Sequence, residues 1–147
     1  DIALINKKPT PIRITKTDFK SARIKDAFFE TQSTLDYNGV YKGYYIEFDA
    51  KETASETSFA ISNIHPHQIE YIKKVLKHNG IVFLIVRFTK LNKNYILKGR
   101  QLIDFLNTNE RKSIPLKYFE ENCYKIELKY SPRLDYIKVV DKLIKEI

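Results

Sequence analysis

Several residue types and patterns are scarce in this chain, and each absence excludes a class of protein. Cys123 is the only cysteine among 147 residues, so no intrachain disulfide can form and a reducing, cytoplasmic setting is expected. The longest apolar run, residues 81–86, falls far short of the roughly 20 residues that a membrane helix needs, and no segment has the pattern of a signal peptide. Methionine is absent and the chain starts at Asp1, so we expect a natural N-terminal segment to be missing.

Positive charge is the main feature of the composition. The chain has 26 lysines and arginines against 18 acidic residues, a net charge of +8 and a pI near 9.4. Such a balance favours a polyanionic partner, nucleic acid above all. Abundant Lys, Ile, Asn and Tyr would also result from an AT-rich genome, so charge alone leaves both interpretations open.

The hydrophobic pattern predicts a single α/β domain, with strands mostly in the first half. Residues 12–24 alternate apolar and basic side chains and predict a protruding strand pair. The Asn38-Gly39 pair predicts a tight turn, and the fully apolar residues 81–86 predict a central strand. Helices are expected after Pro66, with Gly80 as the stop, and in three later segments, residues 101–107, 115–122 and 135–147.

Residues 44–51 predict a strand with two unlike faces. Its even positions are apolar, whereas its odd positions include Glu47, Asp49 and Lys51, so Asp49 and Lys51 project from one face. Asp36 precedes the expected turn, and a hairpin would bring it to Asp49. Two carboxylates suit Mg²⁺, and an adjacent lysine can orient water or stabilise a pentavalent phosphate. The set indicates a phosphodiesterase, although a surface salt bridge gives the same pattern.

Other polar residues admit two interpretations each. Gln68, in the first turn of the expected helix, can reach a metal-bound water or phosphate, or can simply cap the helix. His65 and His67 lack the further His or Cys ligands of a zinc site, so we expect them to line a helix start near DNA. Cys123 has no evident catalytic partner and is expected to be packed.

Seven stretches, in order along nearly the whole chain, carry a family resemblance. They are Lys7-Lys8-Pro9-Thr10-Pro11, Ser33-Thr34-Leu35-Asp36-Tyr37-Asn38-Gly39-Val40-Tyr41, Asp49-Ala50-Lys51-Glu52-Thr53, Asn63-Ile64-His65-Pro66-His67-Gln68, Gly80-Ile81-Val82-Phe83, Arg111-Lys112-Ser113-Ile114-Pro115 and Ser131-Pro132-Arg133-Leu134-Asp135-Tyr136. Together they resemble the RecU family of Holliday junction resolvases. That family belongs to the restriction-endonuclease-like, or PD-(D/E)xK, superfamily.

The resemblance implies a fold, a reaction and a set of residue roles. The fold would be a mixed β-sheet flanked by helices, with residues 1–147 as one nuclease domain and a basic stalk at about 11–30. The protein would be a homodimer that resolves four-way junctions by paired symmetric nicks in recombination and DNA repair, with other recombination proteins among its partners. Thr34, Asp36, Asp49 and Gln68 fall on the magnesium positions, with Mn²⁺ as the alternative metal, and Lys51 falls on the lysine that stabilises the transition state.

The stalk is where the resemblance places junction contacts. They are Phe29, which would stack on exposed bases, and the cations Arg13, Lys16, Lys20, Arg23 and Lys25. One departure from the family is Asp49, where the usual residue is the longer glutamate. Two other functions stay open: a junction-binding protein with a vestigial nuclease site, and a restriction-like enzyme that cuts linear duplex at specific sequences.

Overall fold

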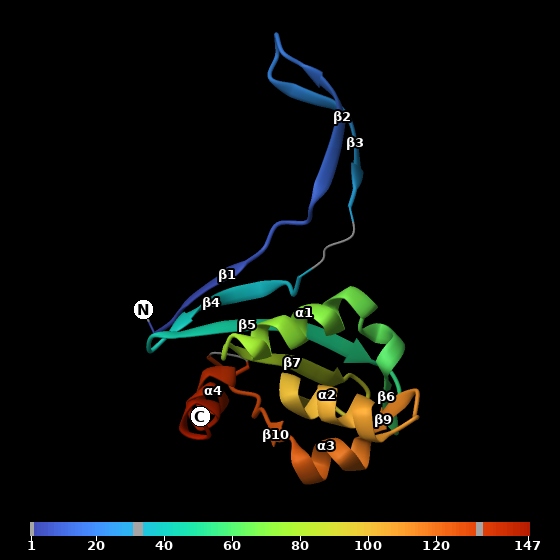
Figure 1. The fold of residues 1–147 in the computed structure, drawn as a ribbon, viewed down its shortest axis with the longest axis vertical. Coiled ribbons are helices and arrows are strands. Elements are labelled where there is room, and N and C mark those ends of the chain that lie inside the picture. The colour runs from blue at the N-terminus through green and yellow to red at the C-terminus, as the bar shows by residue number, and fades with distance from the viewer. Residues whose placement is uncertain (1, 31–33, 132–133) are drawn as a thin grey trace.

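A six-stranded mixed sheet forms the body of the molecule (Figure 1). The computed structural model describes residues 2–30, 34–131 and 134–147. The sheet has the order β1-β4-β5-β7-β8-β10, in which only β5 and β7 run parallel. Its strands are β1 (Leu4–Lys7), β4 (Tyr37–Tyr41), β5 (Tyr44–Thr53), β7 (Ile81–Phe88), β8 (Lys93–Lys98) and β10 (Tyr124–Lys125). The expected mixed α/β fold is confirmed.

Helices cover both faces of this sheet. Three pack on one face and α4 packs on the other, so β7 is buried on both sides, as its apolar run predicts. The helices are α1 (Pro66–Lys77), α2 (Gly99–Thr108), α3 (Leu116–Asn122) and α4 (Tyr136–Lys145), with a 3-10 turn, η1 (Ile61–Asn63), and a small ladder of β6 (Ser58–Ala60) with β9 (Ser113–Pro115). Among the described residues no helix is long and apolar enough to cross a membrane.

A separate hairpin projects from the body and lies within the segment expected to form the stalk (Figure 1). It pairs β2 (Ile12–Asp18) with β3 (Arg23–Phe29) in antiparallel register, from Ile12 opposite Phe29 to Asp18 opposite Arg23. Every residue of the two strands except Asp18 is exposed. The hairpin, called the stalk below, therefore adds little to the core, and its side chains are free to contact a partner.

The prediction of a tight turn at Asn38-Gly39 is wrong. Both residues lie inside β4, and the turn into β5 instead uses Lys42 and Gly43, which both have positive φ, at 50° and 83°. Gly39 has a different purpose, because a Cβ there would lie 2.0 Å from the Leu4 carbonyl oxygen of β1. Similarly, the positive φ after α1 falls on Asn79 rather than on Gly80, the expected stop.

Replacing Gly39 by alanine is expected to lower the free energy of unfolding by about 2–3 kcal/mol, because the new methyl group must displace the backbone of β1. Urea denaturation measures the loss. The matched control is Gly43→Asn, since asparagine tolerates positive φ and nothing lies within 4 Å of the Gly43 position. Equal stability of the two variants would contradict the explanation given for Gly39.

Candidate active site

Two carboxylates meet where β4 begins beside β5. Tyr37 pairs with Phe48 in the antiparallel register, so Asp36, the residue before β4, lies next to Asp49 on β5. Asp49 is 2% exposed, because α1 covers this face of the sheet. The charged face predicted for β5 is therefore largely covered by protein: Glu47 and Asp49 are buried, whereas Ala50 on the apolar side is exposed.

Hydrogen bonds orient Asp49 from several sides. Its Oδ1 accepts the Ala50 backbone N–H at 2.7 Å, and its Oδ2 lies 3.0 Å from Lys51 Nζ. Gln68 Nε2 donates to the same Oδ2 at 3.0 Å, while Gln68 Oε1 accepts from Lys51 Nζ at 3.1 Å. Asp49, Lys51 and Gln68 thus form a closed triangle in which a carboxylate, an ammonium and an amide fix one another.

Gln68 also serves the helix that carries it. Its Oε1 accepts the backbone N–H of His65, the N-cap of α1, at 3.3 Å. The capping interpretation therefore describes this residue, and the same amide also joins the start of α1 to Asp49 on β5. The rings of His65 and His67 stack 5.3 Å apart at the same helix start.

Asp36 is half-buried, and its surroundings disfavour its ionised form. Burial raises the pKa of its carboxyl above the usual value, and the charge of Asp49 raises it further, against the opposing effects of Lys51 and Lys7. A hydrogen bond between the two side chains adds to the increase in the pKa of Asp36. Two carboxyl groups facing each other this closely repel unless a proton or a cation lies between them.

This arrangement fits a hard divalent cation. The carboxyl groups of Asp36 and Asp49 face each other, and the Gln68 amide lies against Asp49, with its Nε2 donating to Asp49 and its Oε1 accepting from Lys51. Thr34 lies in the bend before Asp36, where its hydroxyl donates to the Leu35 carbonyl at 3.4 Å. Mg²⁺ prefers such oxygen ligands and keeps several of its waters, so two carboxylates can suffice. Within the described residues no group of three or more His, Cys, Asp or Glu lies together in a metal-binding cluster.

Cys123 lies away from these carboxylates, just after α3. Its thiol is 3.7 Å from Gln101 Oε1, and burial raises the pKa of the thiol to about 12. Because the thiolate is the reactive form, a thiol with so high a pKa is inert at neutral pH. Cys123 has the surroundings of a packed residue rather than of a nucleophile.

The stalk carries the expected basic residues along its whole length. Arg13 lies near the base and is bonded to Glu30 at 2.6 Å, while Lys20 lies in the turn at the tip; Lys16, Arg23 and Lys25 lie between them. Phe29 ends β3 at the base and is 79% exposed. Phe19, an aromatic residue that was not predicted from the sequence to contact DNA, lies at the tip and is 93% exposed.

A buried acid beside the candidate site, Glu47, was also not predicted from the sequence to have a role. Glu47 is 0% exposed and accepts hydrogen bonds from Lys8 Nζ and from the Tyr45 hydroxyl. Burial and this bond to Glu47 raise the pKa of Tyr45, so the phenol stays protonated. The only sequence signal was that Glu47 shares a strand face with Asp49.

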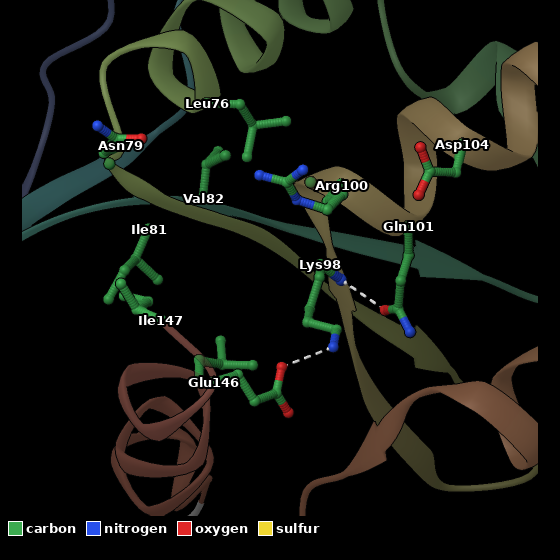
Figure 2. A pocket seen from close by; sticks show the side chains of 13 residues that line it. Leu76, Asn79, Ile81, Val82, Lys98, Arg100, Gln101, Asp104, Glu146 and Ile147 are labelled. Carbon is green, nitrogen blue, oxygen red and sulfur yellow. Dashed lines mark hydrogen bonds and ion pairs between the residues drawn. The ribbon is translucent and has the colours of Figure 1, made fainter.

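A hollow of about 560 Å³ lies at the C-terminal end of α1, away from Gln68 at its N-terminal end (Figure 2). It is lined by Leu76 of α1, Val82 of β7, Arg100 of α2 and Glu146, which accepts from Lys98 Nζ at 2.8 Å. None of the catalytic or DNA-contacting residues predicted above lines it. The hollow is therefore separate from the Asp36–Asp49 site.

A mixed sheet that presents Asp-x-Lys on one strand and a second acid beside it has the architecture of the restriction-endonuclease-like class. Comparison with known proteins is more specific. The family model of RecU, described as Recombination protein U, matches residues 1–142. The chain belongs to the RecU family.

Similar proteins carry the name of the same family. The chain is similar to proteins named Holliday junction resolvase RecU. That of Pediococcus pentosaceus is 50% identical, over 99% of this chain and 76% of that protein. That of a Geobacillus species is 49% identical, over 97% and 74%. That of Staphylococcus aureus is 48% identical, over 98% and 72%.

Proposed function

We propose that this protein is a Mg²⁺-dependent endonuclease that resolves Holliday junctions. The relatives that share about half of its sequence are named for that reaction. The observation that carries the proposal is the convergence of Asp36 and Asp49 with Lys51 and Gln68 at the body end of an exposed basic stalk. A cation site beside a lysine is what phosphodiester hydrolysis requires.

Each residue has a task that follows from its contacts. Asp36 and Asp49 would hold Mg²⁺ with Gln68 and Thr34, and the bound ion would act as a Lewis acid toward the phosphate. The Lys51 side chain is 16% exposed and its Nζ lies 3.0 Å from Asp49 Oδ2; its ammonium would donate to a phosphate oxygen that gains negative charge. Gln68 keeps both Asp49 and Lys51 in place, so their geometry is formed before substrate binds.

The stalk and the symmetry of the substrate complete the proposal. The exposed cations of the stalk would contact the junction phosphates, and Phe29 would stack on unpaired bases. A homodimer would place two copies of the site on opposed strands, because a four-way junction has near two-fold symmetry. Each protomer would then make one of two symmetric nicks in the cytoplasm, during recombination and repair, alongside other recombination proteins.

Cleavage of a synthetic four-way junction with labelled strands tests the proposal. With Mg²⁺ the wild-type protein is expected to nick two opposed strands at symmetric positions. Lys51→Ala is expected to slow cleavage about 100- to 1,000-fold, the usual effect of removing one donor to a charged transition state. Lys73→Ala is the matched control, since Lys73 is an exposed lysine on the surface of α1, paired with Glu70.

Two other outcomes would contradict the proposal, and each would indicate a different function. Preferred cutting of linear duplex over the branched substrate would indicate a restriction-like enzyme. Tight junction binding without cleavage in Mg²⁺ or Mn²⁺ would indicate a junction-binding protein with a vestigial site. Cutting by both Asp36→Asn and Lys51→Ala at the wild-type rate would show that the active residues lie elsewhere.

A further inference from the structure

Lys8 lies where the chain passes from the body into the stalk. It directly follows β1, and Pro9 and Pro11 then lead into β2. Its side chain does not extend into solvent, being only 20% exposed, but turns into the body. A lysine is rarely covered to this extent unless its ammonium has partners.

The main partner of Lys8 is the buried carboxylate of Glu47. This carboxylate is 0% exposed and also accepts from the Tyr45 hydroxyl. Glu47 lies two positions before Asp49 on the same face of β5, since side chains alternate along a strand. A buried ion pair of this kind contributes little net stability, but removing one partner leaves an uncompensated charge.

Lys8 also contacts the other two elements that present candidate site residues. Its backbone N–H donates to the Asp36 carbonyl oxygen at 2.7 Å. Its Nζ lies 5.3 Å from the ring centroid of Tyr71, which is one turn after Gln68 on α1. Lys8 therefore contacts the bend that holds Asp36, the strand that holds Asp49 and the helix that holds Gln68.

We propose that Lys8 is a positioning residue that fixes Asp36, Asp49 and Gln68 relative to one another and to the base of the stalk. It acts through Glu47 and Tyr71 and does not itself touch substrate. The inference rests on the function proposed above, because that function assigns Asp36, Asp49 and Gln68 to one cation site. It adds that the residue at which β1 leads into the stalk also supports the site.

The test measures Mn²⁺ binding to the DNA-free protein by electron paramagnetic resonance, alongside junction cleavage. Breaking the ion pair in a charge-balanced way, with Lys8→Met combined with Glu47→Gln, leaves no unpaired buried charge and allows folding. This double variant is expected to bind Mn²⁺ at least about 10-fold more weakly, the usual effect of losing a residue that supports metal ligands. Its cleavage rate should fall in parallel, while junction affinity without metal stays that of the wild type.

Two further variants separate positioning from general stability. Glu47→Gln alone keeps an acceptor for Lys8 and for the Tyr45 hydroxyl but removes the negative charge of the pair, so its Mn²⁺ affinity should fall between that of the wild type and that of the double variant. Lys42→Met removes another lysine that is bonded to a carboxylate, Asp141 at 2.7 Å, and should leave Mn²⁺ binding unchanged. Near-ultraviolet circular dichroism and urea denaturation establish that each variant is folded at the temperature of the measurement.

The outcomes distinguish this inference from the proposed function. A folded double variant that binds Mn²⁺ as tightly as the wild type would overturn the role of Lys8, whatever the junction assay shows. Wild-type protein that binds Mn²⁺ but cuts no junction would defeat the proposed function alone. Weaker Mn²⁺ binding by the double variant would then still support the positioning role.

Discussion

Replacing Asp36 by asparagine is expected to abolish junction cleavage while leaving junction binding intact. The substitution keeps the shape of the side chain but removes one of the two converging carboxylates. A loss of at least about 1,000-fold in rate, equivalent to roughly 4 kcal/mol of transition-state stabilisation, is expected. Single-turnover cleavage of a labelled four-way junction measures the rate, and gel shift without metal measures the affinity.

Folding stability provides an independent readout for the same variant. Burial and the charge of Asp49 raise the pKa of Asp36, so the ionised carboxylate destabilises the folded state at pH values above its ordinary pKa. Asp36→Asn removes that charge and is therefore expected to be as stable as the wild type or more so at neutral pH. A loss of activity combined with a loss of stability would instead indicate unfolding.

A surface carboxylate provides the matched control. Asp141 on α4 is bonded to Lys42 at 2.7 Å and to the Tyr41 hydroxyl at 3.0 Å, on the face of the sheet opposite α1. Asp141→Asn makes the same chemical change and should leave cleavage unaffected. Wild-type cleavage by Asp36→Asn would remove this residue from the site.

Local periodicity explains why the sheet and the site strand could be predicted from the sequence. Residues 44–51 alternate along β5, and the apolar residues 81–86 form the centre of β7, because burial on one or both faces fixes the residue types directly. Asp49 and Lys51 follow from the same alternation. The closed triangle with Gln68 was expected only in outline, since it depends on where α1 packs.

Contacts between segments distant in sequence explain what could not be predicted. Asn38-Gly39 has the local signature of a turn, but the neighbouring strand β1 lies so close to Gly39 that only glycine fits there. The pairing of Lys8 with Glu47 leaves no local pattern, because it is set by the packing of β1 and β4 against β5. Phe19 was missed because the exact turn of the stalk, which exposes it, has no clear glycine or proline signal.

Shortening the stalk should have the second large effect, on binding rather than on chemistry. Residues 13–28 can be replaced by Asn-Gly, which closes a two-residue hairpin between Ile12 and Phe29, already paired in the register. Pro11 and Glu30 keep their backbone hydrogen bond of 2.9 Å at the base. Because the removed residues, Asp18 aside, are exposed, the body is expected to fold and to bind Mn²⁺ normally.

The shortened protein loses five cations, Arg13, Lys16, Lys20, Arg23 and Lys25. Each cation that contacts a phosphate contributes about 0.9 to the slope of log affinity against log salt on duplex DNA. If all five make contact, the slope should flatten by about 4 to 5, and affinity should fall by about 100-fold or more at moderate salt. Fluorescence anisotropy with a labelled four-way junction over a salt series gives both quantities.

A full-length stalk with the five cations changed to glutamine separates charge from shape. If the stalk acts only through phosphates, this variant should bind as weakly as the shortened protein and show the same flat salt response. If stalk shape or exposed aromatic residues such as Phe19 also contribute, it should keep a preference for four-way over linear DNA that the shortened protein lacks. Unchanged junction affinity in both variants would mean that the body, and not the stalk, binds the junction.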